Sequence, residues 1–409
     1  MTLTQDVQMV KILVVDDEPL MKSLILQSFK DQISAEEIDF QFALNGEEAL
    51  KIVNENHDIG IVLTVIVMPE MDGLTLLGHL SKLNRAFRTI VISAYGDMKN
   101  IRTAMNRGAS EFITKPIDLQ DLKDTVAKTI SEYHELKKGV TARERVIELN
   151  KELKIAHEIQ QSFIPVNFDV VFSERNPVDL IGEMIPAKEI GGDFFDFIKL
   201  DNHRLAFFIA DVSGKGIPAA LLMSRCSVLM HGVALAANQS CVECMLAVNK
   251  TLCDKNDACM FVTAFYGILN VNTGDLNYCN AGHNPPILFG DNKCVFIGIN
   301  QGIALGVDME HEELFTEHSI KLNKNDLIVL YTDGVTEAGY SDNKKEFYTE
   351  ERLKNVIEKY GDDPLSDILK AIKDDVTAFI GNSPQRDDIT IFLIRYLGNS
   401  NDDSTTQLQ

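Results

Sequence analysis

The sequence is poor in basic residues: it has 39 Lys and Arg against 61 Asp and Glu in 409 residues, a formal net charge of −22. Such an acidic surplus repels phosphate backbones and anionic membranes, and no local basic patch offsets it, so neither nucleic acid nor a membrane is an expected partner. Most of the surplus is expected to be solvated surface, although acidic residues also build metal sites. Hydrophobic residues make up 45% of the chain, which excludes wholesale disorder and, at this length, predicts two or three domains.

Long apolar runs and export signals are also missing. No stretch of about 18 uninterrupted apolar residues occurs, and residues 1–10 lack a basic segment followed by an apolar one, so a cytoplasmic location is expected. All seven cysteines lie between positions 226 and 294, and without an export signal they are expected to be reduced thiols. Cys241 and Cys244 have the spacing of metal ligands, but no second Cys or His pair accompanies them, so the evidence for zinc is weak.

The first 125 residues alternate apolar runs with amphipathic stretches, which predicts an α/β doubly wound, five-stranded parallel sheet. The expected strands are residues 11–17, 39–43, 59–67, 88–94 and 110–116. Helices are expected between them, at residues 19–30, 46–54, 73–83, 98–106 and 119–132. Because such sheets place their polar chemistry at the carboxyl ends of the strands, the candidate site residues are those at these ends: Asp16, Asp17, Val65, Ser93 and Lys115.

These residues, together with the segment V-x-x-M-P-E-M-D-G at 65–73 and the Lys-Pro pair at 115–116, resemble the receiver domain of bacterial response regulators over residues 9–128. The resemblance implies that Asp16 and Asp17 bind Mg²⁺ and that Ser93 and Lys115 bind the oxygens of a phosphoryl group. It also implies that Phe112 is the switch aromatic. A carboxylate nucleophile among other carboxylates needs a divalent cation and a lysine to offset the charge.

Val65 departs from this pattern, because it stands where the family has the Asp that accepts the phosphoryl group. Valine has no nucleophile and supplies no metal ligand, so Mg²⁺ binding in the receiver is expected to be weakened or absent. Two interpretations stay open: a natural pseudo-receiver that works by contact alone, or a variant in which an ancestral acceptor has been replaced. The retained Asp16, Asp17, Ser93 and Lys115 favour the second. A sensor histidine kinase is expected as a partner only of a receiver with Asp at position 65.

Residues 129–165 are polar and helical, and they form a predicted linker. Residues spaced three and four apart form a heptad-like seam, apolar except at Gln160. The seam consists of Val146, Leu149, Leu153, Ala156, Gln160 and Phe163. The seam is short and contains a glutamine, and Gly139 is expected to interrupt the helix upstream of it. A dimeric coiled coil and a helix packed on a neighbouring domain are both compatible with this pattern.

Residues 166–397 contain β-rich runs around two helical stretches, which predicts an α+β sandwich with helices outside two sheets, αββα. The expected strands are residues 204–213, 261–270, 275–282, 285–290, 326–334 and 387–396, and the expected helices are 217–236 and 240–253. The polar tail, 398–409, is expected to be disordered.

Four segments of this region place aspartates at the edge of an apolar run, next to glycine or another acid: GGDFFD (191–196), ADVSGKG (210–216), YTDGVTEA (331–338) and QRDDIT (385–390). One such aspartate is usually a turn or helix-cap residue. Four segments of the same kind point instead to a cluster of oxygen ligands, which suits Mg²⁺ or Mn²⁺ better than Zn²⁺.

In this order, and with EIQQSFIP (158–165) and NAGHNPP (280–286), the segments resemble the sporulation and stress-response branch of the PPM family of metal-dependent Ser/Thr protein phosphatases. The resemblance, over about residues 155–397, implies two Mn²⁺ or Mg²⁺ ions, with Asp211 bridging them and the carbonyl of Val212 helping. The implied metal ligands are Asp193, Asp211, Asp333 and Asp387, with Asp388 as a less certain one. Asp196 is a further acid behind the ligands, and His283 is either an acid for the leaving group or, as its neighbours favour, a structural turn residue.

Two divalent ions lower the pKa of the water between them and neutralise charge on a phosphoryl group, so the expected reaction is hydrolysis of phosphoserine or phosphothreonine. The resemblance implies a phosphorylated anti-sigma-factor antagonist as substrate, with the receiver and linker gating the phosphatase in a homodimer. The main alternative is a non-catalytic adaptor with a degenerate phosphatase domain. The presence of all four carboxylates favours the enzyme, and a DNA-binding regulator is disfavoured because no basic recognition helix is present.

Overall fold

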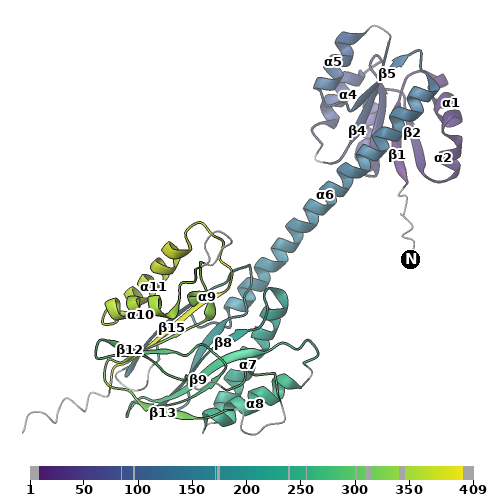
Figure 1. Cartoon of the computed structure of the whole chain (residues 1–409). Helices are drawn as coiled ribbons and strands as arrows, with labels where there is room; N and C mark the ends of the chain where they lie inside the picture. The colour runs from purple at the N-terminus through teal and green to yellow at the C-terminus, as the bar shows by residue number, and fades with distance from the viewer. Residues whose placement is uncertain are drawn as a thin grey trace, which may run out of the picture. The chain divides into compact units, whose positions relative to one another are not determined.

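The computed structural model describes residues 9–83, 85–94, 97–170, 172, 176–237, 240–254, 256–299, 302–308, 315–339 and 346–398. The chain divides between Leu149 and Asn150 into two compact units. We call them the receiver unit and the sandwich unit, and each is described by itself (Figure 1). The predicted tail lies outside the described residues from position 399 onward.

The receiver unit contains the predicted five-stranded parallel sheet. Its strands are β1 (Val10–Val15), β2 (Ile38–Ala43), β3 (Ile59–Val65), β4 (Arg88–Ala94) and β5 (Glu111–Lys115), in the order β2-β1-β3-β4-β5. All seven residues of β3 are buried, as expected for a central parallel strand covered on both faces. Val65 is the last residue of β3, so the sheet places it beside the carboxyl ends of β1 and β4.

Five helices connect or follow these strands: α1 (Pro19–Ser28), α2 (Lys30–Ser34), α3 (Gly46–Glu55), α4 (Gly73–Leu80) and α5 (Met98–Asn106). Three of them, α3, α4 and α5, start at side-chain caps, and the cap of α5 is Asp97. The side chain of Asn45 accepts a hydrogen bond from the backbone N–H of Glu48, and that of Asp72 accepts one from Thr75 at 2.6 Å. The carboxylate of Asp72 is therefore occupied at the start of α4.

Helix α6 (Leu119–Gln161) is longer than the sequence predicts, because it continues through Gly139. The expected interruption there is wrong. A glycine inside a helix costs only about 1 kcal/mol relative to alanine, which the rest of a 43-residue helix outweighs. In the receiver unit, Tyr133 of α6 packs over Gly60 of β3 so closely that a Cβ at position 60 would lie 2.1 Å from the Tyr133 ring.

The sandwich unit contains two five-stranded antiparallel sheets. One has the order β13-β10-β9-β8-β7 and the other β12-β11-β14-β15-β6. The strands are β6 (Val178–Ile185), β7 (Phe194–Lys199), β8 (Arg204–Val212), β9 (Val262–Asn270), β10 (Asp275–Ala281), β11 (Ile287–Gly290), β12 (Lys293–Phe296), β13 (His318–Lys321), β14 (Leu327–Tyr331) and β15 (Ile389–Tyr396). The sequence did not predict β6, β7, β12 and β13.

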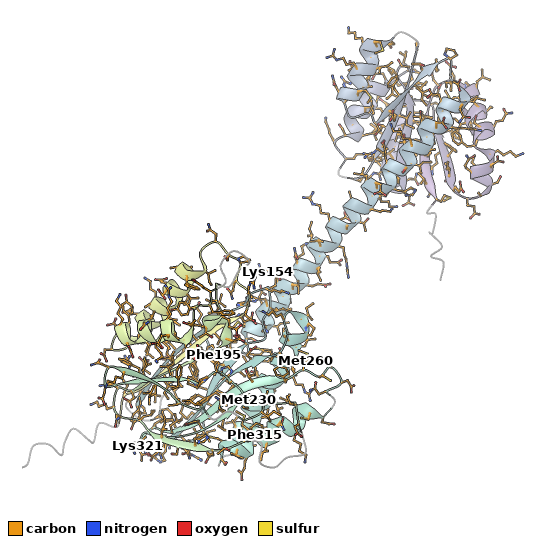
Figure 2. All side chains as sticks on the ribbon, in the orientation of Figure 1. Lys154, Phe195, Met230, Met260, Phe315 and Lys321 are labelled. Atoms are coloured by element: carbon orange, nitrogen blue, oxygen red, sulfur yellow. The ribbon has the colours of Figure 1, made fainter. Side chains whose placement is uncertain are left out.

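Helices cover both outer faces of the two sheets (Figure 1). Helices α7 (Ile217–Ala237) and α8 (Cys241–Cys253) pack on the sheet of β7 to β10, and α10 (Glu350–Tyr360) and α11 (Leu365–Ile380) pack on the other. The short α9 (Asp333–Thr336) follows β14. Between the sheets, Phe195 stacks on Phe392 with 4.8 Å between ring centroids, and Figure 2 shows Phe195 inside the unit. The predicted αββα sandwich is confirmed.

Helix α7 is long and apolar enough, by length and composition, to cross a membrane. Its inward residues follow one another at helical spacing, are at most 1% exposed and lie in the core of the sandwich unit; they are Ala219, Met223, Cys226, Met230 and Ala234. This one-sided burial is the pattern of a core helix in a sandwich.

Candidate active site

Asp193 is the most deeply buried of the predicted acids. It lies directly before β7, after Gly191 and Gly192, and is 2% exposed. The hydroxyls of Thr332 and Thr390 donate hydrogen bonds to its Oδ2 at 2.6 and 2.7 Å. Burial, and then the neighbouring carboxylates of Asp211 and Asp388, raise the pKa of Asp193 well above its usual range. The two threonines hold this carboxylate in place without supplying a positive charge.

Asp211 and Asp333 extend the group. Asp211 is the penultimate residue of β8, and Asp333 is the first residue of α9. Burial, followed by repulsion from Asp333, raises the pKa of Asp211 to about 7. Burial, followed by repulsion from Asp387, raises the pKa of Asp333 to about 6. The structure thus brings together the four acids that the sequence predicts, which come from four separate segments.

Lys215 offsets part of this charge. Its Nζ donates to Oδ2 of Asp387 at 2.6 Å and to the carbonyl of Arg386 at 2.7 Å. The ion pair is half-exposed, so it is expected to contribute less than about 1 kcal/mol. Lys215 also lowers the pKa of Asp333, but burial and the surrounding carboxylates outweigh it. The carboxylates still repel one another.

Both oxygens of Asp388 bind backbone N–H groups. Oδ1 accepts from Ala187 at 2.7 Å and Oδ2 from Gly192 at 2.6 Å, which ties the segment after β6 to the loop before Asp193. A Cβ on Gly191 would lie 2.5 Å from Oδ2 of Asp388, so glycine is required at this close approach. These contacts point to a positioning role for Asp388, and its coordination of a metal stays a prediction.

Asp196 and His283, the two less certain residues, have other partners. Oδ2 of Asp196 lies 2.6 Å from Nδ1 of His231 on α7, and no other aspartate contributes to its pKa shift. His283 is 1% exposed, and its Nδ1 lies 3.0 Å from the hydroxyl of Thr263. Burial lowers the pKa of His283 to about 4. A neutral, enclosed imidazole favours the structural role over that of an acid for a leaving group.

The donor set at this site suits a hard divalent cation. Every side-chain ligand is a carboxylate oxygen, and the carbonyl of Val212 lies at the same edge of β8. In the part of the chain that the structure describes, no three Asp, Glu, His or Cys side chains already surround one point as a complete ligand set. Burial and mutual repulsion raise the pKa of Asp193, Asp211 and Asp333, and a bound cation would relieve that repulsion. The residues therefore fit Mg²⁺ or Mn²⁺.

Sequence reasoning missed the residues that hold the acids. Thr332 and Thr390 stand beside Asp333 and Asp388 in two of the acidic motifs, which is the one sequence signal of their role. Gln160, which the sequence places in the helical seam, is instead 3% exposed. Its amide donates to the carbonyl of Gly191 at 2.6 Å and accepts from the N–H of Gly191 at 3.0 Å. Near its end, α6 thus contacts the loop that carries Asp193.

The receiver pocket contains one strongly buried acid. Asp16 lies just after β1 with a 2% exposed side chain, and its Oδ1 accepts from the N–H of Glu18 at 2.7 Å. Nζ of Lys115 lies 3.7 Å from Oδ2 of Asp16 and 3.3 Å from Glu18. Burial raises the pKa of Asp16, and Lys115 opposes that shift. Asp17 is exposed.

The other predicted receiver residues lie around this pocket. Val65 is 5% exposed and adds only an apolar surface. The hydroxyl of Ser93, at the end of β4, lies 3.4 Å from Oδ2 of Asp97, the residue that caps α5. Phe112 on β5 is 41% exposed. The sheet therefore gathers Asp16, Ser93 and Lys115 at one edge, with Val65 among them.

Comparison with known proteins assigns both units. The sequence model of the Stage II sporulation protein E (SpoIIE) family matches residues 201–397, and that of the response regulator receiver domain matches residues 12–127. The chain is 29% identical over 250 residues to the phosphoserine phosphatase RsbU of Bacillus subtilis, which covers 61% of this chain and 71% of RsbU. It is 31% identical over 122 residues to the chemotaxis protein CheY of Listeria monocytogenes, covering 29% of this chain and 98% of CheY.

Among solved structures, the PP2C domain of SiaA from Pseudomonas aeruginosa superposes with a TM-score of 0.53 at 18% identity, covering 62% of this chain and 98% of that domain. This likeness shows the fold. Together with the acidic cluster, the matches to the SpoIIE family and to RsbU define the class: a metal-dependent protein serine/threonine phosphatase. The chain belongs to the response regulator family, with a receiver domain joined to a SpoIIE-type PP2C phosphatase domain.

Proposed function

We propose that this chain removes phosphate from phosphoserine or phosphothreonine in a small partner protein of the anti-sigma-factor-antagonist type. The observation that carries the proposal is the convergence of four carboxylates from four segments, with a pKa of about 7 at Asp211 and about 6 at Asp333. Such unbalanced charge is costly in a fold and is typical of functional sites. The substrate class follows from the resemblance to the phosphatase branch and from the similarity to RsbU.

The chain's own residues have distinct tasks in this reaction. Asp193, Asp211, Asp333 and Asp387 would hold two Mn²⁺ or Mg²⁺ ions, with the carbonyl of Val212. When bound, such ions supply an activated water and neutralise charge on the phosphoryl oxygens. Thr332 and Thr390 keep the Asp193 carboxylate oriented by their hydrogen bonds. Positioned groups that do not reorganise during the reaction are the main source of such catalysis.

Phosphate release from a phosphoserine protein in the presence of Mn²⁺ tests the proposal. Wild-type chain should release phosphate, and Asp211→Ala should be slower by about 10³-fold, the scale on which single electrostatic groups act at a reacting centre. Asp196→Asn is the matched control, because Asp196 pairs with His231 rather than with the cluster, and it should retain activity within a few-fold. Equal rates for wild type and Asp211→Ala would refute the phosphatase assignment of this site.

We further propose that α6 gates the phosphatase. Support comes from the two hydrogen bonds between the Gln160 amide and Gly191, two residues before Asp193. A displacement of the end of α6 would break these bonds and release the loop that presents the carboxylate. The receiver unit would act on the phosphatase through the same helix, since α6 begins in the receiver unit with Leu119.

Gln160→Leu should test the gate. Loss of both hydrogen bonds leaves the Gly191 groups unpaired, so the loop should loosen and about 10-fold more Mn²⁺ should be needed for half-maximal activity. Gln161→Leu, one residue further on and less buried, is the matched control and should leave the Mn²⁺ requirement unchanged. If both variants behave like wild type, α6 does not gate the site through Gly191.

The assembly and location expected for such a regulator complete the proposal. Several apolar side chains of α6 are 43% to 58% exposed, namely Val146, Ile147, Leu149, Ile155 and Ile159, which supports pairing with α6 of a second copy. We propose a homodimer in the cytoplasm, with a sensor kinase acting only on a chain that has Asp at position 65. Sedimentation of wild type and of Val146→Asp should show a dimer and a monomer, respectively.

A further inference from the structure

A pocket of about 330 Å³ lies beside the acidic cluster. We call it the Phe347 pocket. Its apolar lining consists of Ala338, Phe347, Ile380, Pro384 and Ile389, and its polar lining includes Lys215, Glu337, Gln385, Arg386 and Asp387. The volume is at the lower end of the range of ligand pockets, so it suits a single large side chain better than a cofactor.

The pocket and the proposed metal site share residues. Asp387, a candidate metal ligand, and Lys215, which donates to Asp387 at 2.6 Å, line the pocket as well. A phosphoryl group bound at the carboxylate cluster would therefore lie next to the entrance of the pocket. Since an extended chain advances about 3.3–3.6 Å per residue, a residue close to the phosphorylated one would reach it.

Hydrogen bonds within the protein hold the walls of the pocket in place, so the pocket is formed before a substrate binds. The amide of Gln385 donates to the carbonyls of Ile185 and Asp387, at 2.8 Å each. The carbonyl of Ala338 accepts from the N–H of Tyr348 at 3.1 Å, next to Phe347 in the chain. Ala338 and Ile389 are 8% and 6% exposed.

Phe347 differs from these walls because its side chain is 45% exposed. An aromatic side chain that is half in solvent at the edge of a preformed pocket gains burial when an apolar group enters. The basic residue Lys215 stands on the side of the pocket that borders the cluster, since its Nζ donates to Asp387, and there the phosphate of a substrate would add negative charge.

We propose that the Phe347 pocket binds an apolar side chain of the substrate, close in sequence to the phosphorylated serine or threonine, and so selects which phosphoprotein is dephosphorylated. This inference rests on the proposed phosphatase function. The pocket would recognise an aliphatic or aromatic residue, while the acidic cluster with its ions would take the phosphate. Because the recognised side chain lies close in sequence to the phosphorylated residue, a short phosphopeptide should be able to bind in the same way.

A panel of nine-residue phosphoserine peptides tests the inference with the full-length chain and Mn²⁺. The central residue is phosphoserine, all others are alanine, and one leucine is moved through the remaining positions. Burial of one leucine side chain should raise kcat/KM about 10-fold or more over the all-alanine peptide at one position. Hydrolysis of para-nitrophenyl phosphate, which has no neighbouring residue, measures the amount of working enzyme.

Two variants change the pocket in opposite ways. Ala338→Leu fills it and Phe347→Ala removes its exposed wall. For both variants, we divide the rate for the preferred leucine peptide by the rate for para-nitrophenyl phosphate. This ratio should fall nearly to the ratio measured for the all-alanine peptide. Ala378→Leu on α11 is the matched control. Ala378 lines the groove between α10 and α11 instead of this pocket, and its variant should keep the leucine preference.

The outcomes separate the inference from the function on which it rests. Hydrolysis of para-nitrophenyl phosphate without any leucine preference among the peptides would overturn the inference and leave the phosphatase intact. A preference that persists in Ala338→Leu and Phe347→Ala would overturn it too. If the wild-type chain shows no Mn²⁺-dependent hydrolysis of any substrate, the proposed function itself fails, and the inference with it.

Discussion

Asp16 in the receiver unit and Asp193 in the sandwich unit are both buried carboxylates at the end of a loop or strand, but their surroundings balance the charge differently. Lys115 lies 3.7 Å from Asp16, and the position that would add a further acid holds Val65. Asp193 has only two threonine hydroxyls as donors, and it adjoins Asp211 and Asp388. We therefore expect the phosphatase cluster to bind divalent cations more strongly than the receiver pocket, because Lys215 offsets only part of the charge of the cluster.

One chain thus holds two acidic sites with different expected requirements for metal ions. With Val65 at the end of β3, we expect the receiver pocket to bind metal weakly and to accept no phosphoryl group at position 65. In the phosphatase cluster, burial and neighbouring carboxylates raise the pKa of Asp193, Asp211 and Asp333, and bound metal ions would offset this repulsion. Variants at each site test this difference.

Val65→Asp should convert the receiver pocket into one that accepts a phosphoryl group. The new carboxylate supplies both a nucleophile and a further ligand for Mg²⁺, next to Asp16 and Lys115. Incubation with radiolabelled acetyl phosphate and Mg²⁺ should label the variant and leave the wild-type chain unlabelled. Val65→Asn, of similar shape but without a carboxylate, is the control and should stay unlabelled. Labelling of the wild-type chain would contradict this account of the receiver.

Thermal unfolding should separate the two units by their response to metal. At about 100 times its dissociation constant, Mn²⁺ should stabilise the sandwich unit by about 2.7 kcal/mol, which raises Tm by about 5–10 °C for a domain of this size. Asp211→Asn removes one repelling charge, so its Tm without metal should exceed that of wild type by a few degrees, and the Mn²⁺ shift should disappear. A wild-type Mn²⁺ shift that survives in Asp211→Asn would place the ions elsewhere.

Thr332→Val tests the groups behind the ligands. The hydroxyl of Thr332 donates to Asp193 at 2.6 Å, and loss of such an outer contact typically weakens metal binding by about 10–100-fold. Calorimetric titration with Mn²⁺ measures the change. Thr64→Val in the receiver is the matched control, because the hydroxyl of Thr64 donates to the carbonyl of Val65 and not to a carboxylate. An unchanged Mn²⁺ affinity in Thr332→Val would show that Asp193 is held by other contacts.

Lys215→Met should have the smallest effect. Lys215 competes with a metal ion for Asp387, but the ion pair is half-exposed and worth less than about 1 kcal/mol. The variant should therefore bind Mn²⁺ about two- to five-fold more tightly in the same titration. Lys128→Met, which removes a receiver lysine that pairs with Glu111 away from both acidic sites, should leave Mn²⁺ binding unchanged. Weaker Mn²⁺ binding in Lys215→Met would show that the lysine supports the ions rather than opposing them.

The sequence predicted those parts of the fold whose residues are uniformly apolar. Strands β3 and β14 are buried along their whole length, and such continuous runs are evident without a structure. The sequence missed β12 and β13, whose residues alternate between half-buried and exposed. Each has only four residues and lies at the edge of its sheet, so the strand pattern is too short to recognise.

The same contrast holds at the phosphatase site. The acids could be predicted because their motifs combine aspartate with glycine at the ends of apolar runs. Their holding contacts could not, because they depend on long-range pairing: Thr332 reaches Asp193 across 139 positions, and Gln160 reaches Gly191 across 31. The helical spacing of the seam also shows only which face of α6 a residue occupies. It does not show what packs on that face, so it could not predict that Gln160 contacts Gly191.

Calorimetric titration of the full-length chain with Mn²⁺ tests the central claim most directly, since it counts the ions that each acidic site requires. We expect two ions per wild-type chain, none in Asp211→Ala, and two again in Asp16→Asn, because Lys215 offsets only part of the charge of the phosphatase cluster. Binding that is lost in Asp16→Asn and retained in Asp211→Ala would contradict this expectation.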